Sequence, residues 1–356
     1  MQEYKNMGQD GSKPRNHTFD LLCGICILRM ITLHVAGMCG FRGDYWCERM
    51  MAWTFFFMSF FFFKAGYFNK TVAGDSRSYV IDKTRRLLIP YVSWAVIGNA
   101  VFFGLMLFNL QLFEPFFEKR FTLEHLWSTS RVYGNAPLWF LFSFYVAYLA
   151  MHFIGKVRHL RWIIIAFPFI SYWLFTLENP LWMSLNNVFL GIFFFFLGRL
   201  WHWVVEHVKT SRIPVFPYTR LLFLLVCVLM LVCFYFVNRY HHGEYDMSLN
   251  KYVQHADGAI ISTVLALCGV SGILLLLPQR PIPLINYVGQ HSMVYFVAHY
   301  PLILLYHLLH RLFGHTIRGH WDEFILILLF VLITCSFLVP LVERVPILSG
   351  RWKKKA

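Results

Sequence analysis

The chain has 356 residues, of which 58% are hydrophobic and only 14% are charged. Soluble domains carry about 25% charged and roughly 45–50% apolar residues, so this composition excludes an ordinary soluble fold and indicates an integral membrane protein. The formal net charge of +14 does not indicate a nucleic-acid partner, because the Lys and Arg residues are spread between apolar runs, as the positive-inside rule predicts.

The first predicted element is a polar N-terminal tail at 1–17, and ten apolar segments follow it. A helix needs about 20 apolar residues to cross ~30 Å of hydrocarbon. The segments that meet or approach this length lie at 18–39, 51–69, 87–109, 136–154, 162–177, 185–203, 220–237, 256–277, 287–310 and 322–343. They predict an all-α, polytopic membrane domain over 18–345 with about ten transmembrane helices, followed by a basic cytoplasmic tail at 346–356.

The distribution of Lys and Arg sets the predicted orientation of these helices. If the N-terminus is cytoplasmic, the internal segments hold 21 Lys and Arg residues and the external segments hold 9. Such an excess marks the cytoplasmic side of a membrane protein, and an even number of spans brings both termini to that side. We therefore expect a multi-pass protein in the lipid bilayer of the inner or plasma membrane of the cell.

Ionisable side chains inside apolar spans are costly in hydrocarbon, so each one is a functional candidate. The first span contains Arg29 and His34, the second contains Lys64, and the ninth contains His299. Arg29 and His34 differ by about 140° around an ideal helix and do not share a face. Lys64 is near enough to the cytoplasmic end of its span for its ammonium group to snorkel to the interface.

Histidine is the natural candidate for acid–base chemistry among these residues. It titrates near neutrality and can take a proton from a sugar hydroxyl as a general base. In the ninth span, the spacing of Ser292, Tyr295 and His299 makes one polar stripe along the helix. A single intramembrane histidine is often only a structural hydrogen-bonding group, but two of them, His34 and His299, with cations nearby favour a site.

The motifs of soluble enzymes are absent from the sequence. It contains no GxSxG, HExxH, GxGxxG or Walker motif. The Cys23-x-x-Cys26 pattern lies within the first predicted span, where cysteine behaves as a small hydrophobic residue, so it does not favour a redox or zinc site. We expect neither a metal ion nor a tightly bound cofactor.

Six stretches resemble, in order, the motifs of one family of integral membrane proteins, acyltransferase family 3. The run FDLLCGI at 19–25, followed by His34, resembles the family pattern D-x-L-R-G-[IL] with a later His. The other matching stretches are FFFKAGY at 61–67, KTRRLLIPY at 83–91, PLWFL at 137–141, FFFLG at 194–198 and YVGQHS at 287–292 with Tyr295 and His299. Each motif is short, but the resemblance runs from about residue 18 to 345, nearly the whole chain.

The resemblance implies a membrane O-acyltransferase, most often an O-acetyltransferase, that modifies an envelope or surface carbohydrate or a lipid-linked sugar. It also implies a cytoplasmic acyl-coenzyme A donor, most often acetyl-coenzyme A. The family's essential His corresponds to His34, and its cationic pair corresponds to Lys83 and Arg86. With Arg85, these side chains suit the phosphates of coenzyme A, since guanidinium binds phosphate bidentately and ammonium acts as a point charge.

The sequence departs from the family pattern at the first-span arginine, which is Cys23 here. A thiol has neither the charge nor the donors of a guanidinium group. We expect Arg29, which lies too deep to snorkel, to take over part of the cationic role, with Lys64 as the second choice. Arg29 therefore joins His34 and His299 among the predicted catalytic residues, and Lys64 joins the predicted donor-binding residues.

Two other functional classes stay open on the sequence alone. A multi-span transporter or flippase of a small molecule or lipid-linked sugar would show paired, Gly- or Pro-interrupted halves, which are not evident. A non-catalytic membrane scaffold would not need ionisable residues within hydrocarbon. The sequence names neither the acceptor, the acyl group nor the oligomeric state.

Overall fold

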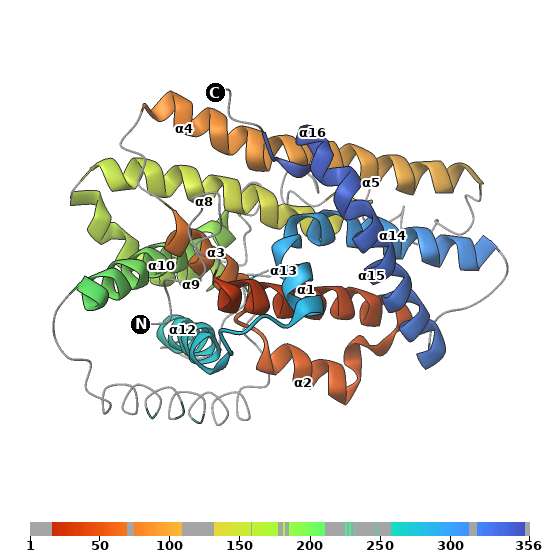
Figure 1. The fold of residues 1–356 in the computed structure, drawn as a ribbon, viewed down its shortest axis with the longest axis horizontal. Helices are drawn as coiled ribbons and strands as arrows, with labels where there is room; N and C mark the ends of the chain where they lie inside the picture. The colour runs from red at the N-terminus through yellow and green to blue at the C-terminus, as the bar shows by residue number, and fades with distance from the viewer. Residues whose placement is uncertain are drawn as a thin grey trace.

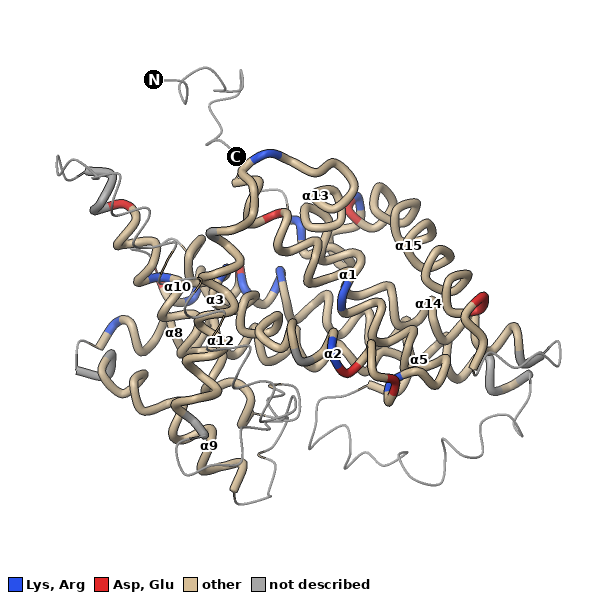
Figure 2. Tube along the Cα trace, turned by 90° about the horizontal axis from the view of Figure 1, so that it is seen from below, with Lys and Arg blue, Asp and Glu red and all other residues tan. Residues whose placement is uncertain are grey.

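The computed structural model describes residues 16–69, 75–108, 132–157, 159–176, 185–210, 258–312 and 319–352, together with five single positions between 181 and 247. Within these ranges the secondary structure is helical, apart from one β-bridge between Val132 and Asn135. This part of the chain therefore confirms the all-α class. Most of its length carries no charge, and Figure 2 shows the Lys, Arg, Asp and Glu residues in short separate stretches.

The helices pack side by side in one bundle (Figure 1). In chain order they are α1 (His17–Cys39), α2 (Tyr45–Trp53), α3 (Phe57–Phe68), α4 (Ser76–Lys83), α5 (Ile89–Phe108), α8 (Trp139–Lys156), α9 (Phe167–Thr176), α10 (Asn186–Thr210), α12 (Gly258–Leu276), α13 (Pro283–Gln290), α14 (Ser292–Leu312), α15 (Trp321–Arg344) and α16 (Pro346–Ser349). A π-helical turn, η3 (Thr84–Leu88), joins α4 to α5, and these elements form one long rod along the edge of the bundle in Figure 1.

Six helices in the described residues are long and apolar enough to cross a membrane. They are His17–Cys39, Ser76–Gly104, Ala136–Lys156, Asn186–Glu206, Ser292–His310 and Trp321–Arg344. The predicted spans at 162–177 and 256–277 contain the shorter apolar helices Trp162–Thr176 and Ile260–Leu274, and the span at 51–69 is divided between α2 and α3. The predicted span at 220–237 lies outside the described ranges. The membrane class is thus supported, while the count of ten and the cytoplasmic termini stay predictions.

Helix α1 lies in the middle of the bundle (Figure 1) and contacts α3, α12, α13, α14 and α15. Its N-terminus is capped by the side-chain oxygen of Asn16, which accepts a hydrogen bond from the backbone N–H of Phe19 at 3.3 Å. Such a cap satisfies one of the free N–H groups at a helix start. Because apolar residues surround α1 on several sides, its few polar side chains lie within the bundle.

Hydrogen bonds and ring contacts define the directions of the helices that form the candidate site. The side chain of Asn286, on α13 just before α14, donates to the carbonyl of His17 at the start of α1. His34, further along α1, contacts the ring of His299 on α14. Helices α1 and α14 therefore run in the same direction. Helix α15 runs against α14, because Tyr306 near the end of α14 bonds to Glu323 near the start of α15.

Two pairs of glycines allow close contact between helix backbones. A Cβ on Gly66 of α3 would lie 1.8 Å from the carbonyl oxygen of Phe195, and one on Gly198 of α10 would lie 1.9 Å from that of Phe63. The same reciprocal contact joins Gly24 of α1 and Gly289 beside it on α13. Small residues of this kind are typical of helix contacts within membranes. All four glycines belong to the motif stretches of the sequence, so part of that pattern reflects packing.

Candidate active site

The structure places in contact two histidines that the sequence predicts as separate candidates in different spans. The rings of His34 on α1 and His299 on α14 have their centroids 5.2 Å apart, with 39° between their planes. The ring of Tyr300 lies edge-on to His34 at 5.5 Å. His299 is fully buried and His34 is partly exposed. This His34–His299 pair is the centre of the candidate site.

The hydrogen bonds of His299 indicate which ring nitrogen carries a proton. Its Nδ1 lies 2.8 Å from the carbonyl oxygen of Phe296 and 3.1 Å from that of Tyr295. A carbonyl oxygen only accepts, so Nδ1 carries the hydrogen, and in the neutral ring Nε2 is then an acceptor. Nε2 is buried and has no hydrogen-bond partner among the described residues. A buried acceptor of this kind is unusual in proteins and is available to an N–H or O–H donor.

The polar stripe predicted along the ninth span faces more than one neighbour. The hydroxyl of Tyr295 contacts the hydroxyl of Ser336 on α15 at 2.6 Å, whereas His299 contacts α1. On a third side, the buried Asn135 donates from its side-chain nitrogen to the carbonyl of Val297 at 2.7 Å. Polar contacts from three parts of the chain thus hold this stretch of α14 in place.

Arg29 is held between α1 and the segment that joins α2 to α3. Its Nε donates to the hydroxyl of Thr54 at 2.8 Å, and its guanidinium carbon lies 3.9 Å from the ring centre of Phe57. Such cation–π contact is favourable where the cation has lost water. Arg29 precedes His34 by five residues on α1, which is about 7.5 Å along the helix axis and about 140° around it. Lys64 lies on α3, and its side chain is partly buried.

The predicted donor-binding residues lie on and beside η3, and their side chains make different contacts. Arg86 bonds through Nε to Asp82 at 2.8 Å. The Lys83 ammonium lies 3.9 Å from Asp82 and 4.2 Å from the ring centre of Tyr148, and only 15% of its side chain is exposed. Arg85 is exposed. The backbone of η3 is π-helical, and π-helical turns often occur at functional sites. This supports η3 as a candidate binding element.

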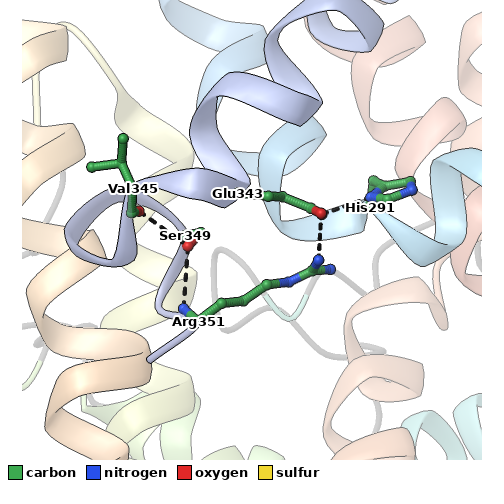
Figure 3. Close-up of polar contacts among 5 residues, drawn as sticks. All are labelled: His291, Glu343, Val345, Ser349 and Arg351. Carbon is green, nitrogen blue, oxygen red and sulfur yellow. Dashed lines mark hydrogen bonds and ion pairs between the residues drawn. The ribbon is translucent and has the colours of Figure 1, made fainter. Parts of the chain in front are cut away.

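Two charged residues that were not singled out in the sequence, Glu343 and Arg351, form a contact network with His291. Glu343, near the end of α15, contacts Nδ1 of His291 at 2.6 Å and forms an ion pair with Arg351 (Figure 3). Glu343 is 18% exposed and His291 is 20% exposed. A carboxylate at the end of a long apolar helix was the available signal for Glu343. No sequence signal pointed to Arg351 as its partner.

The predicted site residues therefore form two groups. The first is the His34–His299 pair, and Arg29 lies five residues before His34 on the same helix. The second is the basic set on and near η3, which makes no direct contact with the His34–His299 pair among the described residues. Within the described residues, no three potential metal-ligating side chains lie close enough to hold an ion.

This arrangement defines a helical membrane protein with a histidine pair between two of its helices and a basic turn elsewhere on the bundle. The family model of acyltransferase family 3, described as an acyltransferase domain, matches residues 16–341, and the chain belongs to this family. The resemblance predicted from the six motif stretches is thus confirmed. No curated protein and no solved structure matches the chain significantly. The family and the apolar helices together indicate a membrane acyltransferase.

Proposed function

We propose that this protein is a membrane O-acyltransferase of the cell's inner or plasma membrane. In this proposal it transfers an acyl group, acetyl in the simplest case, from cytoplasmic acyl-coenzyme A to a hydroxyl of an envelope carbohydrate or lipid-linked sugar. The observation that carries the proposal is the contact between His34 and His299 in a chain of an acyltransferase family. A thioester donor is already activated, so the enzyme must chiefly position it, deprotonate the acceptor and stabilise an oxyanion.

In the proposed reaction His34 is the general base. One of its ring nitrogens takes the proton of the acceptor hydroxyl while the hydroxyl oxygen attacks the thioester carbonyl carbon. The new C–O bond forms, the C–S bond breaks, and coenzyme A leaves as a thiolate that takes up the proton. General-base catalysis typically contributes about 10²–10⁴-fold to a rate. The partial exposure of His34 supports this role over one for the fully buried His299.

His299 is assigned here as a positioning residue for His34. Its Nδ1–H is bound to the backbone of its own helix, so Nε2 can accept a hydrogen bond from an N–H of His34. That bond would select the His34 tautomer whose other nitrogen is free to accept a proton. Arg29, five residues before His34 on α1, is assigned to stabilise the negative charge that develops on the attacked carbonyl oxygen.

The donor's phosphates are assigned to the basic residues on and near η3, namely Lys83, Arg85 and Arg86. His291, just before α14, contacts Glu343, whose partner Arg351 is next to Trp352, and the Trp352 indole donates to the carbonyl of Arg85 on η3. His299 lies eight residues after His291. At 1.5 Å per residue this is about 12 Å along the helix, which the flexible pantetheine arm of coenzyme A can span. The phosphates can therefore remain near η3 while the thioester approaches the histidines, and Lys64 is assigned to the path between them.

The family favours this enzyme over a transporter or flippase of lipid-linked sugars, because the matched domain is described as an acyltransferase. The experiment that tests it compares envelope glycans, by mass spectrometry, from cells with the wild-type protein, without it, and with His34→Ala at equal membrane expression. We expect the acyl groups to disappear in the second and third samples. An acylation pattern that is the same in all three would refute the proposed function.

A further inference from the structure

Residues 346–352, which follow α15, fold back onto the bundle. We call residues Pro346–Trp352 the C-terminal strap, of which Pro346–Ser349 form α16. Helix α16 packs against α5 and α15, and the indole N–H of Trp94 on α5 donates to the carbonyl of Leu348 at 3.0 Å. The strap is thus a packed part of the structure.

The second half of the strap lies against the basic turn η3. Gly350 has φ +68°, and a Cβ at this position would lie 2.3 Å from the carbonyl oxygen of Arg86. The indole N–H of Trp352 donates to the carbonyl of Arg85 at 2.9 Å, and the guanidinium of Arg85 lies 5.6 Å from the Trp352 ring centre. Contacts on both sides of Arg351 therefore bring its backbone beside that of η3, although more than 260 residues separate the two segments in the chain.

Arg351 is held in a defined position and yet stays accessible. Its guanidinium pairs with Glu343, which also contacts His291, and its backbone N–H donates to the hydroxyl of Ser349 at 3.2 Å (Figure 3). The Ser349 hydroxyl donates in turn to the carbonyl of Val345 at 3.1 Å. The Arg351 side chain is nevertheless 54% exposed, which is close to the 49% exposure of the Arg86 side chain. An anchored but exposed guanidinium is well suited to bind an external anion.

The charges around η3 and the strap do not balance. The basic side chains are those of Lys83, Arg85, Arg86 and Arg351, and the carboxylates that pair with them are those of Asp82 and Glu343. Among the described residues of this region, two positive charges are left over, even with His291 counted as neutral. Arginine binds phosphate through paired N–H donors, so a phosphate group is the anion that this set fits best.

We propose that the C-terminal strap completes a phosphate-binding site in which Arg351 acts together with Arg85 and Arg86. This inference rests on the proposed function, since it assigns the bound phosphate to the acyl-coenzyme A donor. The same chemistry would suit the phosphate of an anionic lipid headgroup. The strap therefore contributes a ligand-binding arginine and does more than fix the end of the chain.

The test uses the full-length protein in nanodiscs of zwitterionic phosphatidylcholine and measures the affinities for coenzyme A and for pantetheine, which lacks the phosphates. Arg351→Gln should weaken coenzyme A binding about 10- to 100-fold, as expected for the loss of a charge-assisted contact, and leave pantetheine binding unchanged. Arg344→Gln, at an exposed arginine at the end of α15, is the matched control and should leave both affinities unchanged. Arg351→Lys, which can keep the pair with Glu343, should give an intermediate affinity even if Arg351→Gln folds poorly.

The outcomes separate this inference from the proposed function. Equal coenzyme A affinity in wild type and Arg351→Gln, or an equal loss for coenzyme A and pantetheine, would overturn the inference and make the strap a tether only. If the wild type binds no coenzyme A, the proposed donor is wrong. In that case, phosphatidylglycerol in the nanodiscs should raise the thermal stability of wild type but not of Arg351→Gln, which would show that Arg351 binds a lipid phosphate. An equal response of the two proteins to phosphatidylglycerol would overturn the inference.

Discussion

The role assigned to His299 can be tested by two substitutions that each keep one half of its imidazole. Asparagine places an amide nitrogen near Nδ1 and keeps the hydrogen bond to Phe296, which is 2.8 Å long here. It removes the acceptor at Nε2. Glutamine reaches the position of Nε2 and can present its side-chain oxygen there as an acceptor. The pair therefore separates a bond that stabilises α14 from a bond that orients His34.

The expected magnitude follows from the burial of this site. His299 is fully buried, so in His299→Asn the N–H of His34 that points at Nε2 would face the buried side of the pair without an acceptor. Leaving a buried polar group without a partner costs about 1–3 kcal/mol, which corresponds to roughly 5- to 150-fold in rate. We expect His299→Asn to lower kcat by this factor with an unchanged KM for the donor, because the donor's phosphates bind elsewhere. His299→Gln should stay within a few-fold of the wild type.

The assay measures transfer of isotope-labelled acetyl groups from acetyl-coenzyme A to an envelope glycan acceptor by purified protein. Thermal stability and membrane expression of both variants are measured in parallel as controls. If His299 only stabilises its helix, the order reverses, with His299→Asn active and His299→Gln impaired. Wild-type activity in His299→Asn would therefore refute the positioning role.

Two further predictions concern helix packing and the intramembrane cations. Gly66→Ala should lower the stability by at least the roughly 1–3 kcal/mol typical of overpacking, because the added Cβ would lie 1.8 Å from a backbone oxygen. Gly37→Ala is the control: its Cβ would have no atom within 4 Å, so this variant should be neutral or stabilising in the same melting experiment. Equal losses of stability in both variants would contradict this packing argument. Arg29→Gln should reduce acyl transfer more than Lys64→Gln at equal expression, because Arg29 lies on the same helix as His34 and Lys64 lies on α3. Wild-type rates in both variants would show that the site works without either cation.

Several features of the fold could be predicted from sequence because they depend on local composition. Apolar runs long enough to cross a bilayer predict membrane helices, and six of the predicted spans coincide with long apolar helices. The boundaries were less predictable at 51–69, where the chain forms α2 and α3 instead of one helix. Hydrophobicity alone does not distinguish a continuous helix from two shorter ones, because both bury the same side chains.

The sequence by itself determined the membrane class and the family, and it made His34 and His299 candidates because ionisable side chains are costly in hydrocarbon. Only the tertiary structure decided that they meet, because the contact depends on α1 and α14 running in the same direction at a particular rotation. The same holds for Glu343 and Arg351, which become partners only because the strap folds back onto η3. Contacts between distant segments depend on packing of the whole bundle, which no local pattern encodes.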